Sequence, residues 1–283
     1  MKRILSATRG SNGLLPGAEP FSLGEGPVGC LLVHGFTSTP YDLRACAEHL
    51  AAHGIATEGV LLAGHGTKPE DLAQTHLDDW LDSIRVGYAR LAERCDQVFG
   101  LGISLSGNFL LTLTPRLPFS GLILIGTPLK FRYERAYRAA YHVLRAVGKQ
   151  YQRKWYVDHL DAAIRAQRPT YDRFPLACAP ECLTAVEWSK SALSDVRSPV
   201  LILQSTTDHA VDARTITAFR RNLASADITV QWFPNRYHVL VIDHGAETVF
   251  RSITKFIHTR ARVSSPRVST SPLFPQPAEA LPS

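Results

Sequence analysis

The residue whose surroundings most favour chemistry is Ser104. It follows an apolar run at residues 97–101, and an apolar segment of helical character comes after it. A serine on a sharp turn between a strand and a helix has its hydroxyl pushed out of the backbone, within reach of a substrate. Such a turn needs small residues two positions to either side, and these are Gly102 and Ser106, the second in place of the glycine of the G-x-S-x-G pattern. The window allows two interpretations, a nucleophile elbow for acyl transfer and a helix N-cap.

A serine nucleophile needs a base that takes its proton and an acid that orients the base. Asp208 follows an apolar run at residues 199–204, and His238 follows another at residues 228–233. In open α/β sheets, functional residues lie on loops beyond the carboxyl ends of the strands. Ser104 would attack the acyl carbon, His238 would carry the proton, and Asp208 would hold the imidazole in one tautomer. Their order along the chain is that of one sheet-based hydrolase architecture and differs from that of other serine proteases.

Other residues near these loops compete for the same roles. His244 could be the base but lies further from the strand end, beside a predicted helix, and His209 is expected only to flank Asp208. Asp212 and Asp243 could be the acid, although Asp212 stands at a predicted helix start, where capping explains it. A single His or Asp is usually structural, whereas three groups at successive strand ends favour function.

Acyl transfer also needs two N–H groups directed at the oxygen that gains negative charge. Leu105, the residue after the nucleophile, would supply one of them at the N-terminus of a helix. The loop at residues 34–40 follows the apolar run at residues 28–33 and would supply the other through the Phe36 N–H. A simple strand-end turn is the alternative for this loop, but the helix predicted after it favours the oxyanion interpretation.

Strand-like and helix-like segments alternate along the chain. Apolar runs typical of buried strands lie at residues 28–33, 55–62, 97–101, 121–126, 199–204 and 228–233. Amphipathic patterns typical of helices lie at residues 41–53, 77–95, 213–223 and 246–259. Because the strand-like runs are apolar on both faces, the pattern predicts an α/β fold with a mostly parallel central sheet flanked by helices.

The stretch between the fourth and fifth of these strand-like runs is too long for an ordinary loop. It has helical patterns of its own at residues 133–147, 155–166 and 182–191. We expect a core from residues 1–126 and 198–260, a helical cap from residues 127–197 over the ligand crevice, and a disordered tail at residues 261–283, which are rich in serine and proline. A helical excursion on the side of the domain is the alternative for the cap.

The excess positive charge is concentrated in the predicted cap. Residues 130–175 hold 11 lysines and arginines against 4 acidic residues, whereas the remainder of the chain holds 20 against 21. Such a patch could attract nucleic acid, an anionic membrane surface or an acidic substrate. A solvated face of exposed helices is the favoured interpretation, because no nucleic-acid-binding module is recognisable. We therefore expect no nucleic-acid partner, and transient contact with a lipid surface stays open.

The cysteines and the apolar segments indicate the compartment. Five cysteines, without metal-ligand spacing, favour free thiols in a reducing environment. No apolar run is long enough to cross a bilayer, and the first residues lack a stretch of signal-peptide length. We expect a cytoplasmic protein that needs no metal ion and no organic cofactor. The sequence does not indicate an oligomeric state.

Several short motifs together resemble the α/β-hydrolase superfamily and, within it, bacterial monoacylglycerol lipases and small carboxylesterases. They are LPGAEPF (15–21), GPVG (26–29), LLVHGFT (31–37), GHGT (64–67), GISL (102–105), DH (208–209) and YHV (237–239). The likeness spans about residues 14–257 and is weakest in the predicted cap. It implies Ser104, Asp208 and His238 as a catalytic triad, with the N–H groups of Phe36 and Leu105 as oxyanion donors.

Two features depart from the family pattern. The family usually has two glycines where this chain has Ser106-Gly107, and the predicted cap is richer in arginine and tyrosine than a plain lipid-binding lid. No polar residues there match a glycerol head group. We expect a hydrolase of carboxylic esters, either monoacylglycerols or short- to medium-chain esters, that forms an acyl-enzyme. The alternatives are a thioesterase or amidase on the same residues, and a catalytically weak binding protein on a hydrolase fold.

Overall fold

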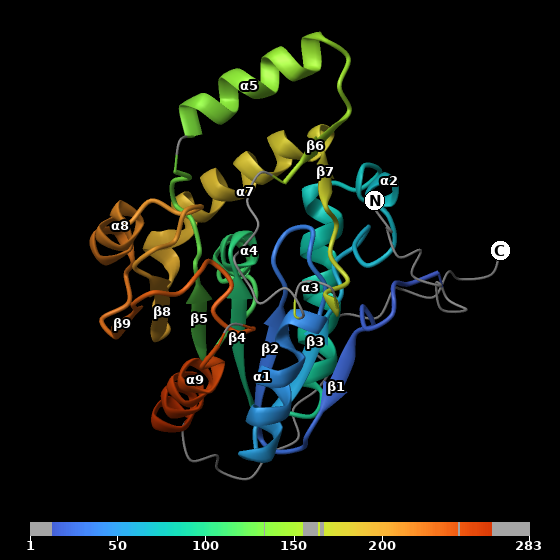
Figure 1. Ribbon diagram of the computed structural model, residues 1–283. Coiled ribbons are helices and arrows are strands. Elements are labelled where there is room, and N and C mark those ends of the chain that lie inside the picture. The colour runs from blue at the N-terminus through green and yellow to red at the C-terminus, as the bar shows by residue number, and fades with distance from the viewer. Residues whose placement is uncertain (1–12, 133, 155–163, 165–166, 243, 262–283) are drawn as a thin grey trace, which may run out of the picture.

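The computed structural model describes residues 13–132, 134–154, 164, 167–242 and 244–261 (Figure 1). Its centre is a seven-stranded sheet with the strand order β1-β3-β2-β4-β5-β8-β9. Strand β1 (Phe21–Leu23) pairs antiparallel with β3, and all other neighbours in this sheet are parallel. The remaining strands are β2 (Val28–Val33), β3 (Ala56–Val60), β4 (Gln97–Ile103), β5 (Gly121–Ile125), β8 (Val200–Ser205) and β9 (Ile228–Phe233). The predicted fold class, a mostly parallel sheet flanked by helices, is confirmed.

The apolar runs of the sequence correspond to these strands with small differences at the ends. Strand β3 is shorter than the predicted segment 55–62, whereas β4 extends beyond residue 101 to Ile103. The longer β4 matters for the site, because the strand now ends immediately before Ser104. Strand β1 was not predicted, since three residues are too few to show a periodic pattern.

Helices cover both faces of the sheet, because alternate strand residues point to opposite sides. Leu122 and Leu124 of β5 pack with one group of helices, and Ile123 and Ile125 pack with the other. The first group comprises α3 (Leu77–Ala92), α4 (Leu105–Leu113), α7 (Ala179–Ala192) and α8 (Arg214–Asn222). The second comprises α1 (Tyr41–Ala52) and α9 (Ala246–Arg260). Two apolar layers thus clamp the sheet and leave the strand ends to present functional loops.

The segment between β5 and β8 has its own elements (Figure 1). Helix α5 (Glu134–Ala146) is followed by a two-stranded antiparallel sheet of β6 (Tyr151–Arg153) and β7 (Arg173–Pro175), and α7 then packs on α4. The helix predicted at residues 182–191 lies within α7. Most of the helix predicted at residues 155–166, and residues 262–283 of the predicted tail, lie outside the described residues. Two short helices, α2 (Pro69–Leu72) and the 3-10 turn η1 (Leu176–Cys178), complete this side.

The five cysteines are free thiols, and four of them are buried. Burial raises the pKa of Cys46 and that of Cys178 to about 12. These thiols are therefore protonated near neutral pH, which makes them packing residues rather than nucleophiles. No described helix has both the length and the apolar character needed to span a membrane.

Candidate active site

Ser104 lies at the junction of β4 and α4, in a backbone conformation that few residues other than glycine adopt. Its φ and ψ angles are 55° and −125°. Its backbone N–H donates to the Ile125 carbonyl of the neighbouring strand, with an N–O distance of 2.7 Å. Ser104 stands at the N-cap position of α4, yet its side chain makes no capping hydrogen bond. The helix-cap interpretation therefore does not account for this serine, and the strain of its backbone points to function.

Close contacts at the turn, with backbone at Gly102 and with the Thr127 side chain at Gly107, explain which neighbours must be glycine. A Cβ atom at Gly102 would lie 2.6 Å from the backbone N of Gly107, and one at Gly107 would lie 1.9 Å from Thr127 Oγ1. Ser106 is fully buried, and its hydroxyl donates a hydrogen bond to the His34 carbonyl. The departure from the family pattern is thus accommodated, because Ser106 fits and joins the start of α4 to the loop after β2.

Asp208 and His238 meet at the ends of two adjacent strands. His238 Nδ1 lies 2.8 Å from Asp208 Oδ2, and these side chains are 11% and 2% exposed. The other carboxylate oxygen, Oδ1, accepts N–H groups from Ala210 at 2.8 Å and Val211 at 3.0 Å. Burial by itself would raise the pKa of Asp208, but His238 and these N–H donors outweigh it and lower that pKa. An ionised Asp208 fixes the proton of His238 on Nδ1 and leaves Nε2 as the acceptor.

Gln204 is a site residue that the sequence analysis missed. Its side-chain Nε2 donates to Asp208 Oδ2 at 2.9 Å, the same oxygen that contacts His238. Gln204 is buried, and it is the one amide in the otherwise apolar run at residues 200–204 of β8. A polar residue inside a buried strand was the available signal, since buried polar groups are hydrogen-bonded. Gln204 thus helps to hold the carboxylate of Asp208 in one orientation.

The loops that carry these residues converge around Gly126, which follows β5. Ser104 is bonded to Ile125, the residue before this glycine, and a Cβ atom at Gly126 would lie 3.0 Å from Nδ1 and Cε1 of the His238 ring. A Cβ atom at Gly35 would lie 3.9 Å from that of Ser104. The carboxyl ends of the central strands therefore bring Ser104, His238 and the loop after β2 to one place.

The two predicted oxyanion donors flank Ser104. Leu105 is the first residue of α4, where backbone N–H groups have no partner within the helix. Phe36 is half-buried, and its ring packs edge-on against His65, Trp80 and Phe174, with centroid distances of 5.7, 5.5 and 6.4 Å. The aromatic contacts hold Phe36 in the loop after β2, next to Gly35, where a Cβ atom would lie 3.9 Å from that of Ser104.

Two buried histidines near the site are neutral packing groups. Burial lowers the pKa of His34 to about 4 and that of His65 to about 3. His34 Nε2 accepts the Leu62 N–H at 3.1 Å, and the two imidazole rings pack edge-on at 5.1 Å. His34 and His65 are thus part of the packing beneath the loops after β2 and β3.

The competing residues lie less favourably. His244 is exposed, and His209 is half-buried in the Asp208 loop. Asp212 is paired with Arg214, whose side-chain and backbone hydrogen bonds lower the pKa of Asp212 to about 2. Asp212 also accepts the Arg214 N–H at the start of α8, as expected of a capping residue. Asp243 lies outside the described residues.

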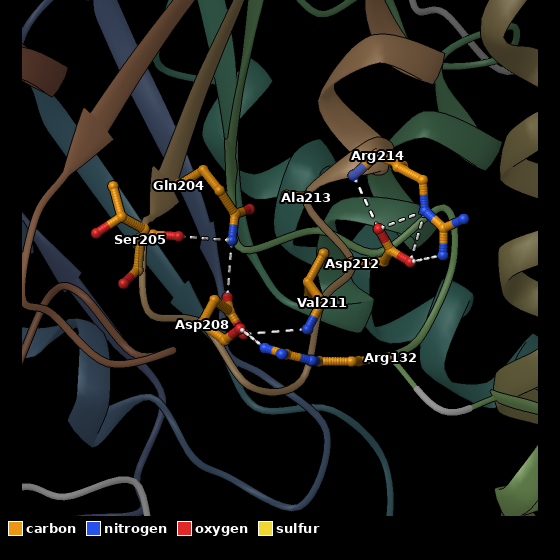
Figure 2. A pocket seen from close by; sticks show the side chains of 9 residues that line it. Arg132, Gln204, Ser205, Asp208, Val211, Asp212, Ala213 and Arg214 are labelled. Carbon is orange, nitrogen blue, oxygen red and sulfur yellow. Dashed lines mark hydrogen bonds and ion pairs between the residues drawn. The ribbon is translucent and has the colours of Figure 1, made fainter.

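A pocket of about 430 Å³ lies beside Asp208, the carboxylate that contacts His238. Figure 2 shows its lining, where Gln204, Val211 and Arg132 are bonded to Asp208 and Arg214 is bonded to Asp212. The Arg132 guanidinium donates to the backbone carbonyl of Asp208 at 3.4 Å. Neither Ser104 nor His238 belongs to this lining, so the pocket adjoins Asp208 rather than the serine elbow.

Comparison with known proteins agrees with this geometry. The family described as "Serine aminopeptidase, S33" matches residues 28–245. The thermostable monoacylglycerol lipase of Bacillus sp. (strain H-257) is 29% identical over 252 residues, which cover 88% of this chain and 97% of the lipase. The carboxylesterase of Bacillus subtilis (strain 168) is 22% identical over 240 residues, which cover 84% of this chain and 96% of the esterase. A solved structure from work on the metagenome-derived lipolytic enzymes LipS and LipT has a TM-score of 0.80 at 27% identity, and the match covers 87% of this chain and 99% of that one.

The family match extends over most of the chain. The protein therefore belongs to the Serine aminopeptidase, S33 family and has the α/β-hydrolase fold. Within that fold it is a hydrolase of the carboxylesterase and lipase type.

Proposed function

We propose that this protein cleaves carboxylic esters through an acyl-enzyme formed on Ser104. The observation that carries the proposal is the 2.8 Å contact between His238 and Asp208, next to a serine with a strained backbone. Asp208 holds His238 so that Nε2 accepts the serine proton, and the imidazolium that forms is stabilised by the carboxylate.

The reaction proceeds in two symmetric halves. Ser104 Oγ bonds to the acyl carbon while its proton moves to His238, and the resulting oxyanion accepts the N–H groups of Phe36 and Leu105. Collapse of this intermediate breaks the ester C–O bond, and His238 returns the proton to the leaving alcohol. Water then enters, loses a proton to His238 and releases the acid, which restores Ser104. No metal ion and no organic cofactor takes part.

The proposed substrates are monoacylglycerols or esters of short to medium acyl chains. The names of the two Bacillus relatives support this class. We also propose that residues 127–197 form a cap that shapes the acyl and alcohol sites, since this segment joins β5 to β8 on the side that carries the site loops (Figure 1).

Replacing the proposed nucleophile tests the mechanism. Ser104→Ala should lower the turnover of a short-chain aryl ester by at least about 10³-fold, since the nucleophile and its base act as one unit. A fluorophosphonate probe should label the wild type, and fragmentation of the labelled peptide should place the adduct on Ser104 rather than Ser106. Undiminished turnover in the variant, or an adduct elsewhere, would contradict the proposal. A properly folded wild type that neither reacts with the probe nor hydrolyses esters would favour the binding-protein alternative.

A leaving-group series separates ester hydrolysis from its chemical neighbours. One acyl chain is offered as an ester, a thioester and an anilide, and kcat/KM is compared. When each kcat/KM is divided by the rate constant for uncatalysed hydrolysis of the same substrate, we expect the ester to give the highest ratio. A preference for the thioester or the anilide would instead indicate a thioesterase or an amidase.

An acyl-chain series identifies the substrate more closely. Ethyl esters and 1-monoacylglycerols with the same acyl chains, from short to long, are compared by kcat/KM. A constant advantage of the glycerol esters would indicate a glycerol site, whereas equal values would leave a general carboxylesterase.

We further propose that the enzyme is cytoplasmic. The support is that its cysteines are free and mostly buried thiols, as expected in a reducing compartment. Fractionation of the source cells with detection by antibody tests this, and recovery outside the cytoplasm would contradict it.

A further inference from the structure

Within the proposed cap, the segment that precedes η1 and α7 is bonded to the loop that carries Phe36. We call residues 168–175 the exit segment and residues 34–40 the oxyanion loop. The Thr37 carbonyl accepts two hydrogen bonds from the exit segment, from the Tyr171 N–H at 3.1 Å and from Thr170 Oγ1 at 2.9 Å. Thr37 directly follows Phe36, so these bonds act one residue away from the proposed donor.

A buried ion pair reinforces this connection. The Arg168 guanidinium donates to both carboxylate oxygens of Asp42, at 2.9 Å and 2.6 Å, and the two side chains are 9% and 3% exposed. Asp42 lies in the first turn of α1 and also accepts the hydroxyl of Ser38, a residue of the oxyanion loop. A bidentate, buried pair fixes orientation more strictly than a surface pair does. Arg168 thus reaches the oxyanion loop through Asp42 and Ser38.

The far side of the exit segment is anchored independently. The Tyr171 hydroxyl donates to the Gly64 carbonyl at 2.9 Å and accepts the Thr67 N–H at 2.9 Å. Phe174 packs against the ring of Phe36. Because the exit segment is tied to the loop after β3, it offers the oxyanion loop a fixed support.

The oxyanion loop needs such support. Thr37 has a φ angle of 65°, a conformation that residues other than glycine keep only when their surroundings enforce it. An oxyanion donor also has to lie within a few tenths of an ångström of its working position, since small misplacements cost large factors in rate. The strained residue is Thr37 itself, and the donor that must be precisely placed is its neighbour Phe36. The two hydrogen bonds to the Thr37 carbonyl therefore act where support is needed.

We propose that Arg168 is a positioning residue for catalysis, which orients the Phe36 N–H through the contacts of the exit segment with Asp42, Ser38 and Thr37. The proposal rests on the proposed function, in which Phe36 stabilises the oxyanion. It links the proposed cap to the chemical step, because the exit segment, which lies within the cap, sets the donor geometry.

The test compares Arg168→Met with Arg168→Lys and with Arg173→Met. Arg173 belongs to the same exit segment and donates to Glu70 at 2.8 Å, but that pair is half-exposed and does not touch the oxyanion loop. All rates are divided by the number of active sites that a fluorophosphonate probe titrates, so that misfolded protein does not count. The substrate is a short aryl ester, and a trifluoromethyl ketone serves as the transition-state analogue.

Arg168→Met should lower kcat about 10- to 100-fold with KM changed by less than about 2-fold, because a transition-state contact is weakened. The inhibition constant of the ketone should rise in proportion. Arg168→Lys should recover part of the loss, since one charged bond to Asp42 remains. Arg173→Met should behave like the wild type.

Unchanged kcat and unchanged ketone affinity in Arg168→Met would overturn the proposal, as would equal losses in Arg168→Met and Arg173→Met. If Arg168→Met does not fold, Thr170→Val removes one donor to Thr37, together with an acceptor of the part-buried Lys154 ammonium, and it should lower kcat about 3- to 10-fold by the same reasoning. Wild type that shows no titratable Ser104 would instead refute the proposed function itself.

Discussion

Two parts of the segment between β5 and β8, helix α5 and the exit segment, are held to the rest of the molecule in opposite ways. Helix α5, at its start, is exposed along most of its length, and Val143 and the following Val147 are 63% and 67% exposed. Figure 1 shows α5 at the edge of the molecule, beyond α7. The exit segment, by contrast, is joined to α1 by the buried Arg168–Asp42 ion pair and to the oxyanion loop by two hydrogen bonds to the Thr37 carbonyl. One insertion thus has a loosely held part and a rigid part.

This difference has a physical reason. Donors that stabilise a transition state must be fixed before the substrate arrives, so their supports need buried, saturated hydrogen bonds. In the proposed cap, the exposed apolar residues in and beside α5 would be available for a substrate chain to cover. We therefore expect changes in the loops at the carboxyl ends of the strands to affect the chemical step. Changes in α5 should affect only which substrates are accepted.

The largest expected effect lies in the loop after β8. Asp208→Asn should lower kcat/KM for a short ester by about 10³- to 10⁴-fold, because the amide no longer fixes the working tautomer of His238. Asp212→Asn, four residues further along the chain, is the matched control and should stay within about 3-fold of the wild type, since Asp212 pairs with Arg214. Steady-state kinetics with both variants checks this. If Asp212→Asn lost more activity than Asp208→Asn, the acid of the triad would be Asp212 and not Asp208.

The next effect concerns the bond between the serine elbow and the oxyanion loop. Ser106→Ala removes the donor to the buried His34 carbonyl and should lower the free energy of unfolding by about 1–3 kcal/mol. Denaturant titration measures it. Ser191→Ala, in which an exposed hydroxyl of α7 is removed, should change it by less than about 0.5 kcal/mol. A neutral Ser106→Ala would mean that the elbow and the loop are not energetically joined.

A smaller, pH-dependent effect arises from His65, whose ring lies between those of Phe36 and Tyr171. Its folded pKa, about 3, is below the unfolded value of about 6.5, so the unfolded state binds more protons between these values. Stability is therefore present above pH 6.5 and is lost as the pH falls, by at most about 1.4 kcal/mol per pH unit.

The variant His65→Gln should show a weaker loss of stability between pH 6.5 and pH 5 than the wild type. His142→Gln changes an exposed histidine of α5 and should leave the slope unchanged. Urea titrations at several pH values measure both slopes. Equal slopes in the wild type and His65→Gln would exclude His65 as a source of acid sensitivity.

The smallest expected effect is in α5 and at Val147, which directly follows it. Val143→Ser and Val147→Ser should leave kcat/KM for a short aryl ester within about 2-fold, because both side chains are exposed. Any change should appear only with long acyl chains. A loss on the short ester as large as that of Arg168→Met would remove the contrast between α5 and the exit segment.

The sequence by itself determined the order of the main sheet strands and of the long helices that flank them. Runs of buried strand residues and the turn around Ser104 depend on neighbouring residues alone, so β2, β4, β5, β8 and β9 could be placed within one or two residues. The same local logic put Ser104, Asp208 and His238 at strand ends, and their catalytic roles stay predictions.

Tertiary structure decided how those ends are held. Gln204 and Asp208 are only four positions apart, whereas Ser106 beside His34 and Arg168 beside Asp42 are contacts between distant segments whose meeting depends on strand order. The last pair is 126 positions apart in the chain. No local pattern encodes such a pair, because the hydrogen bond depends on the final distance and orientation of two buried groups, which only the assembled sheet fixes.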